Sequence, residues 1–446
     1  MRWIVVGAGS AGCVAARRLC DAGHDVTLIE SGPPLLPAAV PSAISGDDSF
    51  AALEVPGRVH VDVTAKRTAT GPETIYLRGR GVGGSSAVNA MVALRGDTDR
   101  YRSWGWDDVD DAWQRVLIPA NRPAPVELGR IDRLLLRADS AAEIAPLTRR
   151  DGRRVTAAEA YLWPLAATAG ERFRVRDGCT VDRVSFDDAG AATGVVLADG
   201  TPIAADAVVV AAGAIHTPAI LQRSGLTQAG SGLRDHPAAG LFLRLADHPD
   251  TRLDAADRGL ATAALIQRGA IQVLALNHLG PSAPHDSAML LVALMRPTGP
   301  GGSVRLRSDD PLAPPRVAFD LLRDRADRVQ LAQAVIDVLR MLDRPPFADV
   351  IDEVYIDDAG TPGDALGGDV DAVADWLLRH GADYVHASSS CAELVGGDGG
   401  VGGHEGLYLC DASVFPDIPD ANTHLPTTML AERLSARWPG VAGSTA

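Results

Sequence analysis

The chain has 446 residues and a formal net charge of -15, with 46% hydrophobic and 22% charged residues. These proportions are those of a globular protein and exclude extended disorder, and the length allows two core-forming domains or one large domain with an insertion. The acidic balance, without any basic stripe, disfavours nucleic acid and anionic membranes as partners.

Targeting and redox features favour the cytoplasm. No apolar run of about 18 residues predicts a membrane span, and the chain passes from Met1 directly into a glycine-rich segment that does not resemble a secretory signal. The five cysteines are scattered and form no CxxC pair, which favours reduced thiols over disulfides or a zinc site. They are Cys13, Cys20, Cys179, Cys391 and Cys410. We therefore expect a cytoplasmic protein with no metal site and no integral membrane segment.

The first thirty residues carry a dinucleotide-binding pattern. A buried parallel strand is predicted over residues 3–6, followed by a tight turn, a helix and a second strand over residues 26–29. Gly7, Gly9 and Gly12 form GxGxxG, which brings a pyrophosphate close to the backbone at a helix N-terminus. Glu30, 18 residues after Gly12, ends the second strand and is expected to bind a ribose. An acidic residue there disfavours a 2'-phosphate and leaves NAD or FAD.

A second glycine-dense stretch, YLRGRGVGGSSAVNAMVALRGDTDRY, runs from Tyr76 to Tyr101 outside any simple strand-helix-strand unit. Its glycines permit the backbone to wrap closely around a ligand, and its serines and asparagine offer hydrogen bonds near a helix start. The glycines are Gly79, Gly81, Gly83 and Gly84, and the polar residues are Ser85, Ser86 and Asn89.

With these two stretches, four further segments resemble the glucose-methanol-choline (GMC) oxidoreductases, which are FAD enzymes that oxidise alcohols. Residues 211–226 (AAGAIHTPAILQRSGL) look like the family's second signature, although Gln222 and Thr227 depart from it. The others are GLRDHPAAG at 232–240, residues 303–331, and EGLYLCDASVFPDIPDANTHLPTTMLAERL at 405–434. The motifs occur in the family's order over nearly the whole chain.

The resemblance implies an α/β fold, with a Rossmann-like FAD-binding domain and an inserted α+β substrate domain built on an antiparallel sheet. The FAD-binding domain would comprise residues 1–240 and 382–446, and the substrate domain residues 241–381. The residues implied to bind FAD are Gly7, Gly9, Ser10, Gly12, Glu30, Arg80, Gly83, Gly84, Ser85, Ser86, Asn89, Val181, Ala212, Asp411, Ala412, Thr423, His424 and Leu425. Some relatives attach the flavin through a histidine where this chain has Val88, so we expect non-covalent FAD.

Local patterns agree with this division. Alternating runs around the turns DDAG and ADG predict a small antiparallel excursion before an apolar strand over residues 207–210. Between residues 241 and 381, four strand-like runs and a helix near residues 329–342 predict an antiparallel sheet backed by helices. The stretch 113–154 is shorter than in the family. This predicts either a more open cavity mouth or a compact loop with the same role. The loop 357–372 lacks the spacing of a calcium site.

The chemistry needs a base beside the flavin, and histidine titrates nearest to neutral pH. His386 and His424 stand where the family places its catalytic pair, 38 residues apart, so only the fold could bring them together. Either could be the base, with the other orienting the hydroxyl. Asn422 could contact flavin or substrate, or cap the following helix.

Around His386, the chain has Ser389, Ala392 and Glu393 where glycine, arginine and methionine are usual. Glu393 could raise a nearby histidine pKa and disfavour an anionic substrate, or it could point to solvent. His216 stands where relatives commonly have glycine or another small residue, beside the strand implied to contact the flavin. His236, in the DHP turn, is interpreted as structural.

The leading hypothesis is FAD-dependent oxidation of a small or bulky alcohol, with hydride transfer to flavin N5 and electrons passed to an acceptor other than NAD. That acceptor could be oxygen, a redox cofactor or a protein, and the tail loosely resembles mycofactocin-associated GMC dehydrogenases. The alternatives are an FAD-containing lyase that cleaves cyanohydrins and a non-catalytic flavin-binding partner protein.

Overall fold

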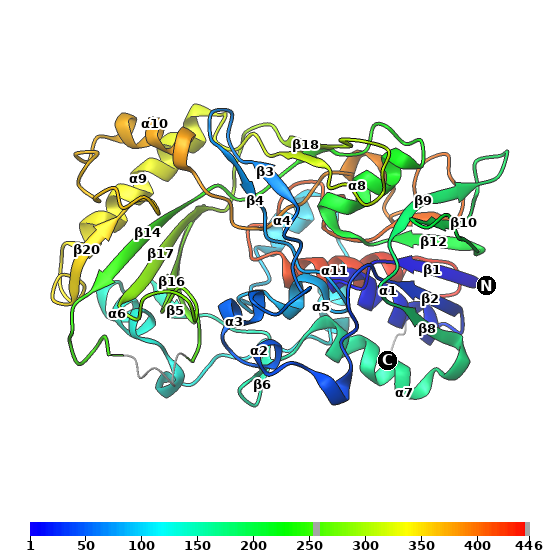
Figure 1. Ribbon diagram of the computed structural model, residues 1–446, viewed down its shortest axis with the longest axis horizontal. Helices are drawn as coiled ribbons and strands as arrows, with labels where there is room; N and C mark the ends of the chain where they lie inside the picture. Colours follow the sequence, from blue (N-terminus) through cyan, green and yellow to red (C-terminus); the bar gives the residue numbers. More distant parts are fainter. Residues whose placement is uncertain (253–258, 442–446) are drawn as a thin grey trace.

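A computed structural model describes residues 1–252 and 259–441 of the chain. It is a mixed α/β structure in which a parallel sheet occupies one half and a large antiparallel sheet the other (Figure 1). Both sheets and the helices between them agree with the predicted FAD-binding and substrate halves. No helix in the described part of the chain is long and apolar enough to cross a membrane.

The parallel sheet has the strand order β21-β12-β1-β2-β8. Its two central strands are almost wholly buried, as the continuous apolar runs predict. The N-terminal strand pairs with the next strand along the chain and with a strand about 200 residues later, all in parallel. The strands are β1 Arg2–Val6, β2 Asp25–Ile29, β8 Phe173–Arg176, β12 Ala207–Val210 and β21 Leu407–Leu409.

A three-stranded antiparallel sheet interrupts the route back to the parallel sheet. It has the order β11-β10-β9, with β9 Val181–Phe186, β10 Ala192–Leu197 and β11 Pro202–Ala204. This confirms the antiparallel excursion predicted from the two turns.

The other half of the molecule is built on a six-stranded antiparallel sheet of order β20-β14-β17-β16-β15-β5. Four of its strands correspond to the four strand-like runs predicted between residues 241 and 381, although β14 begins earlier, at Ala238. The strands are β5 Ala142–Ile144, β14 Ala238–Leu245, β15 Ala264–Arg268, β16 Ile271–Leu276, β17 Ser287–Leu294 and β20 Ile351–Tyr355.

One stretch departs from the predicted domain boundaries. The strand β5 pairs with β15, and the helix α6, Arg130–Ala138, packs against the same strand, although both lie before residue 240. The stretch 113–154 therefore contributes to the substrate half of the molecule. It ends in a two-stranded hairpin, β6 Arg149–Arg150 and β7 Arg153–Arg154.

A third sheet, β13-β18-β19-β3-β4, joins early and late segments of the chain. Its strands are β3 Thr64–Lys66, β4 Glu73–Ile75, β13 Ser231–Leu233, β18 Gly302–Arg305 and β19 Arg316–Ala318. The α-helices are α1 Ser10–Asp21, α2 Ser42–Ser45, α3 Ser49–Leu53, α4 Thr98–Ser103, α5 Val109–Arg115, α6 Arg130–Ala138, α7 Trp163–Thr168, α8 Gly213–Arg223, α9 Arg325–Leu342, α10 Val370–His380 and α11 His424–Ser435.

The first and last long helices of the chain pack against each other. The C-terminal helix α11 lies against α1 and α5, so its first residues reach the glycine turn after β1 (Figure 1). Separate hydrophobic clusters fill the parallel-sheet half and the antiparallel-sheet half. The junction between these cores is where the candidate site lies.

Candidate active site

A single cavity of about 420 Å³ connects the parallel sheet with the antiparallel sheet. It is lined at one end by the turn after β1 and the end of β2, and at the other by side chains of β16 and β17. Both glycine-rich stretches and the first turn of α11 line it between these ends. The segments that the sequence predicts to bind FAD thus meet the sheet predicted to bind substrate.

The turn after β1 requires glycine at two positions. Gly7 has φ of +97°, a conformation that other residues rarely adopt, and a Cβ atom there would lie 2.5 Å from the carbonyl oxygen of Ala211. A Cβ atom at Gly12 would lie 1.8 Å from the carbonyl oxygen of Gly7. Gly9 has open space where its side chain would be, on the cavity wall. The turn is therefore tightly packed on the side of Gly7 and Gly12 and open on the cavity side at Gly9, as a pyrophosphate site needs.

Glu30 ties the two glycine-rich stretches together. Its buried carboxylate accepts the backbone N–H groups of Ala8 at 2.9 Å and of Gly81 at 3.0 Å. It also accepts the N–H of Gly32 at 2.8 Å and lines the cavity. The expected ribose-binding residue thus also fixes the shape of the loops around it.

The second glycine stretch packs directly on the first. A Cβ atom at Gly84 would lie 2.7 Å from the Cα atom of Gly9. Ser85 lines the cavity while its hydroxyl accepts hydrogen bonds from Arg78 and from the N–H of Gly79. Ser86 instead turns inward, where its hydroxyl donates to the carbonyl oxygen of Gly83 at 2.6 Å.

Asn89 is held by a buried arginine that the sequence did not indicate. Arg154 is 1% exposed, and its Nη1 donates to the carbonyl oxygen of Asn89 at 2.6 Å and to Oδ1 of that residue at 2.7 Å. Burial lowers the pKa of Arg154 to about 10, so the guanidinium stays charged at neutral pH. This contact fixes the loop from Asn89 to Val92, which lines the cavity.

Asp411 anchors the C-terminal segment beside the parallel sheet. Its buried carboxylate accepts the N–H of Gly213 at 2.8 Å and the hydroxyl of Thr217 at 2.6 Å. Burial raises its pKa above the usual value for a carboxyl group. Ala212 and Ala412 lie on the cavity wall next to it.

His386 is held in one tautomer by His236. The carbonyl oxygen of Pro419 lies 3.0 Å from Nε2 of His236, so this nitrogen must carry the proton that the carbonyl accepts. Burial lowers the pKa of His236 to about 4, which makes the ring neutral and its Nδ1 an acceptor. Nδ1 of His386, 3.0 Å away, must then carry a proton. Nε2 of His386 is left with a lone pair.

The surroundings of this histidine pair fix the backbone as well. The carboxylate of Asp235 accepts the N–H of His386 at 3.0 Å and the hydroxyl of Tyr76 at 2.5 Å. The preceding residue, Val385, has φ of +54°, a strained conformation for a β-branched residue. Ligand atoms of Asp235, His236 and His386 lie close enough to hold a metal ion, but these hydrogen bonds already occupy those of Asp235 and His236.

His424 lies beside the glycine turn and lines the same cavity as His386. It begins α11, and its Nδ1 lies 2.8 Å from the hydroxyl of Ser10, the first residue of α1. Its Nε2 is buried without a hydrogen-bond partner. Burial lowers its pKa to about 4, so the ring is neutral at neutral pH. No hydrogen bond joins it to His386 in the described part of the chain.

Asn422 faces the cavity and does not cap the helix. The N-cap residue of α11 is Thr423, which makes no side-chain capping bond, and Oδ1 of Asn422 is buried without a partner. Of the two interpretations left open by the sequence, the structure favours the ligand-facing one.

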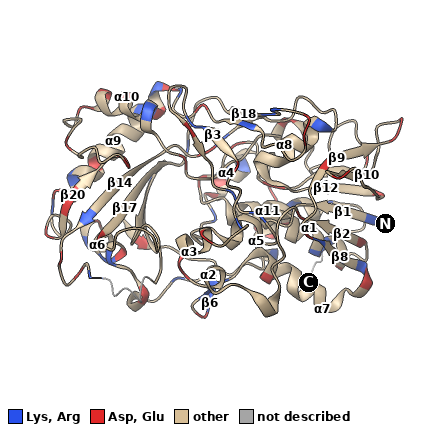
Figure 2. Cartoon of the chain, viewed as in Figure 1, with Lys and Arg blue, Asp and Glu red and all other residues tan. Residues whose placement is uncertain are grey.

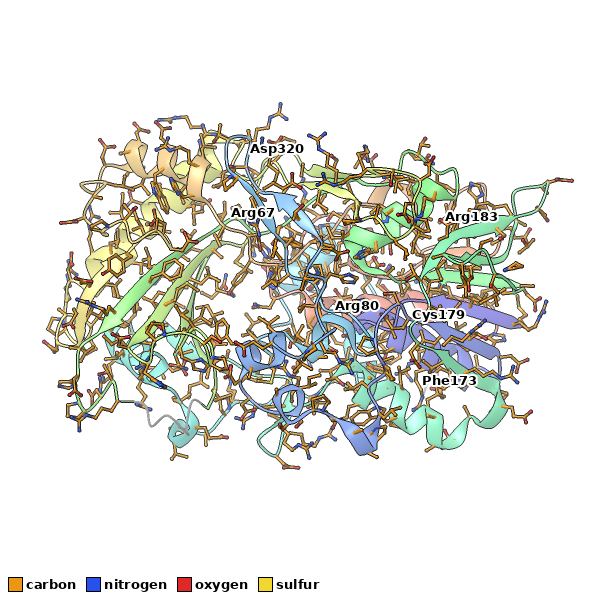
Figure 3. The ribbon with its side chains drawn as sticks, in the orientation of Figure 1. Arg67, Arg80, Phe173, Cys179, Arg183 and Asp320 are labelled. Atoms are coloured by element: carbon orange, nitrogen blue, oxygen red, sulfur yellow. The ribbon has the colours of Figure 1, made fainter. Side chains whose placement is uncertain are left out.

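The expected cofactor residues divide into those that line the cavity and those behind it. Lining residues are Gly7, Gly9, Ser10, Glu30, Gly84, Ser85, Asn89, Val181, Ala212, Asp411, Ala412, Thr423 and His424. Gly12, Arg80, Gly83, Ser86 and Leu425 do not line it. The guanidinium of Arg80, labelled in Figure 3, donates to the carbonyl oxygen of Ser31 at 2.9 Å, which supports the loop from outside.

The structure favours one of the two interpretations left open for Glu393. Its side chain is exposed and lies off the cavity wall, which agrees with the solvent-facing alternative. His236, interpreted as structural, also contacts the predicted catalytic histidine. No local pattern indicates this contact, because the two residues are 150 positions apart.

The lining fits a flavin dinucleotide at its polar end. Buried polar atoms without partners, Oδ1 of Asn422 and Nε2 of His424, face the same space as the glycine turn and the N-terminus of α11. Such atoms are costly unless a ligand satisfies them.

Comparisons with known proteins agree with this geometry. Two family models, both described as GMC oxidoreductase, match residues 1–118 with 138–238, and residues 297–431. An uncharacterised GMC-type oxidoreductase of Rhodococcus erythropolis is 29% identical over 97% of both chains. A 5-(hydroxymethyl)furfural oxidase of Methylovorus is 27% identical over 97% of both, and an oxygen-dependent choline dehydrogenase of Paraburkholderia phytofirmans is 28% identical over 98% of this chain and 94% of the relative.

Solved structures show the same fold. The pyridoxine 4-oxidase of Mesorbium loti superposes with a TM-score of 0.85 at 22% identity, covering 98% of this chain and 99% of that one. A formate oxidase of Aspergillus oryzae, in a structure concerned with FAD modification, has a TM-score of 0.82 at 17% identity over 97% of both chains.

Proposed function

The chain belongs to the GMC oxidoreductase family, and we propose that it oxidises an alcohol with His386 as the base and non-covalently bound FAD as the hydride acceptor. The observation that carries this proposal is the neutral His386, whose Nδ1 donates to His236 and whose Nε2 is left with a lone pair in the cavity. A base must be unprotonated and held in position before it can remove a hydroxyl proton.

The two glycine-rich stretches, Glu30, Asp411 and the first turn of α11 would hold the FAD. When bound, FAD supplies the hydride acceptor, which no side chain can supply. Val88 stands where some relatives attach the flavin through histidine. Because a valine side chain offers no nucleophile, we infer that the FAD is not covalently bound.

The proton moves to this chain's own residues. Nε2 of His386 accepts the hydroxyl proton, and Asn422, whose Oδ1 is buried without a partner, lies on the same cavity wall. His236 keeps the ring of His386 in the productive tautomer through the 3.0 Å contact.

We assign His424 to the cofactor side of the site. Its contact with Ser10 holds it against the helix start that follows the glycine turn, whereas His386 is hydrogen-bonded to His236 and lies edge-on to the ring of Tyr384. The tautomer of His424 is not fixed by its hydroxyl partner, because a serine can either donate or accept. His386 is therefore the better candidate for the base.

The test is anaerobic flavin reduction by alcohols, followed at the flavin absorption band. His386→Ala should slow the reduction by about 100-fold or more, the range for losing a general base. Burial lowers the pKa of His386 well below the ordinary histidine value of about 6.5, so the ring stays neutral at pH 6.5 and somewhat below it. The wild-type rate should therefore be level at higher pH and fall only on the acid side.

His380→Ala serves as the matched control, because His380 lies at the exposed C-terminal end of α10 and should leave the rate unchanged. If no alcohol bleaches the flavin, the oxidation proposal fails. Cleavage of a cyanohydrin with the flavin still oxidised would instead identify a lyase. Reoxidation by air, NAD, artificial acceptors or a protein acceptor then identifies the electron acceptor, which we propose is not NAD.

A further inference from the structure

We propose that the alcohol is uncharged and carries an apolar aryl or alkyl body, which binds against the face of β16 and β17. This inference rests on the proposed function, since it concerns the substrate of the same site. It is carried by the side chains that line the cavity beyond His386.

The apolar wall consists of alternate residues on adjacent strands. Leu274 and Leu276 on β16 both line the cavity, as i and i+2 residues of one sheet face do. Leu274 is directly paired with Leu291 on β17, which also lines the cavity. Neither β16 nor β17 contains a charged residue, and Figure 2 draws β17 entirely in tan.

Residues from the N-terminal part of the chain complete this wall. Phe50 and Leu53 on α3 line the cavity together with Met91 and Val92 from the loop that Arg154 fixes. All except Leu53 belong to one hydrophobic cluster with the leucines of β16 and β17. A continuous apolar surface of this kind binds an apolar ligand body by excluding water from it.

The wall begins next to the proposed base. The ring of Tyr384 belongs to the same cluster and lies edge-on to His386 at 4.7 Å between centroids. Its hydroxyl donates to Oε1 of the buried Gln272 at 2.6 Å and is not free to donate to a substrate. A substrate hydroxyl placed at His386 therefore has its carbon body directed at apolar side chains.

Charged groups on the cavity wall already have partners elsewhere. The carboxylates of Glu30 and Asp411 accept backbone N–H groups at the cofactor end. Asp383 pairs with Arg67, Arg223 pairs with Asp182, and Arg78 donates to Ser85 and to the carbonyl oxygen of Val385. None of these five belongs to the apolar cluster.

A charged group placed against the apolar wall would therefore be buried without a partner. Binding a quaternary ammonium needs a carboxylate or an open aromatic face, and binding a carboxylate needs a free cationic group. Among the described lining residues, the apolar wall carries no carboxylate and no cationic group, and its two aromatic rings, Phe50 and Tyr384, already lie against His278 and His386. Asn422 and Ser49 add only neutral polar groups suited to one hydroxyl.

The first experiment compares alcohols by anaerobic flavin reduction of the holoenzyme. Benzyl alcohol and 1-hexanol should reduce the flavin at least about 100-fold more efficiently than choline or glycolate, because an uncompensated buried charge is costly. From 1-propanol to 1-hexanol, each added methylene should raise the efficiency by roughly fourfold. Equal or better reduction by choline or glycolate would overturn the proposal.

A second measurement does not depend on turnover. Benzyl methyl ether cannot donate a hydroxyl proton, yet it should perturb the oxidised flavin spectrum and bind with a negative heat-capacity change in calorimetry. If the ether binds but no alcohol reduces the flavin, the proposed oxidation fails while the apolar site stands. If alcohols reduce the flavin without regard to polarity and the ether does not bind, the apolar site is disproved while oxidation stands.

A matched pair of variants on β17 tests whether this face of the sheet binds the apolar body of the substrate. Leu291→Ala should flatten the dependence on chain length and lower the efficiency for 1-hexanol by about tenfold. Its neighbour Leu290 is buried in the other cluster and does not line the cavity, so Leu290→Ala should lower stability without changing the selectivity. The same flattening in both variants would contradict the assignment of the wall to this sheet face.

Discussion

At the scale of single residues, the contact that decides the chemistry is the one between His236 and His386. Replacing His236 with Phe leaves Nδ1–H of His386 without an acceptor, and an unsatisfied buried donor costs about 1–3 kcal/mol. The ring would then change tautomer or orientation, and Nε2 would no longer be a reliable base. We expect His236→Phe to slow flavin reduction by about 10- to 100-fold while the affinity for FAD stays near the wild-type value.

The conservative variant distinguishes a positioning role from a structural one. His236→Asn keeps an acceptor atom close to the place of Nδ1, so it should restore most of the rate. In protein labelled with ¹⁵N-histidine, nitrogen NMR should show Nδ1–H on His386 in the wild type and in His236→Asn. If His236→Phe reduces the flavin at the wild-type rate, or if His386 carries its proton on Nε2, His236 does not set the tautomer of His386.

At the scale of elements, the packing of α11 on α1 sets where His424 and Asn422 lie. Near the C-terminal ends of both helices, the fully buried carboxylate of Glu432 binds Nε of Arg18 at 2.7 Å and the hydroxyl of Tyr161 at 2.9 Å. Glu432→Ala would leave both donors unsatisfied, and breaking a buried ion pair typically costs about 3–5 kcal/mol. Since Arg18 is partly exposed, we expect a loss near 3 kcal/mol of unfolding free energy, measured by urea denaturation.

The control for this pair lies on another helix. Asp337 and Arg340 form an exposed pair on α9, and Asp337→Ala should change stability by no more than about 0.5 kcal/mol. Glu432→Ala should also weaken FAD binding, because it loosens the packing of α11, whose first turn lines the cavity. A loss no larger than that of the control would show that this pair does not hold the helices together.

Most of these elements could be predicted from the sequence. The parallel strands, the antiparallel excursion and the strands of the substrate half were predicted because each has a distinct hydrophobic period and a bounding turn. The helix predicted at 329–342 begins four residues earlier, where Asp324 caps it through the N–H of Ala326. The direction in which each side chain points was harder to predict from the sequence. Arg80 and Leu425 lie in the predicted segments but face away from the cavity, and Arg154 and His236 reach the site through tertiary contacts that no local pattern encodes.

For the whole molecule, the cavity brings together the glycine turn after β1, the first turn of α11 and the antiparallel sheet. FAD would therefore bind only the folded arrangement and stabilise it by mass action, by about 2.7 kcal/mol when free FAD is at 100 times its dissociation constant. We expect the melting temperature to rise with FAD concentration and to fall when the flavin is removed. Acid precipitation should leave the flavin in the supernatant, because Val88 offers no atom for a covalent bond.

A matched variant shows whether the rise in melting temperature reports the proposed site. Gly9 lies on the cavity wall with open space at its Cβ position and with φ outside the left-handed region, so Gly9→Val should fold but occupy the room needed by the pyrophosphate. We expect its melting temperature without FAD to be close to that of the wild type and to be insensitive to added FAD. If Gly9→Val is stabilised by FAD as much as the wild type, the dinucleotide does not bind at this turn. Flavin that stays with the precipitated wild-type protein would disprove non-covalent binding while leaving the position of the site intact.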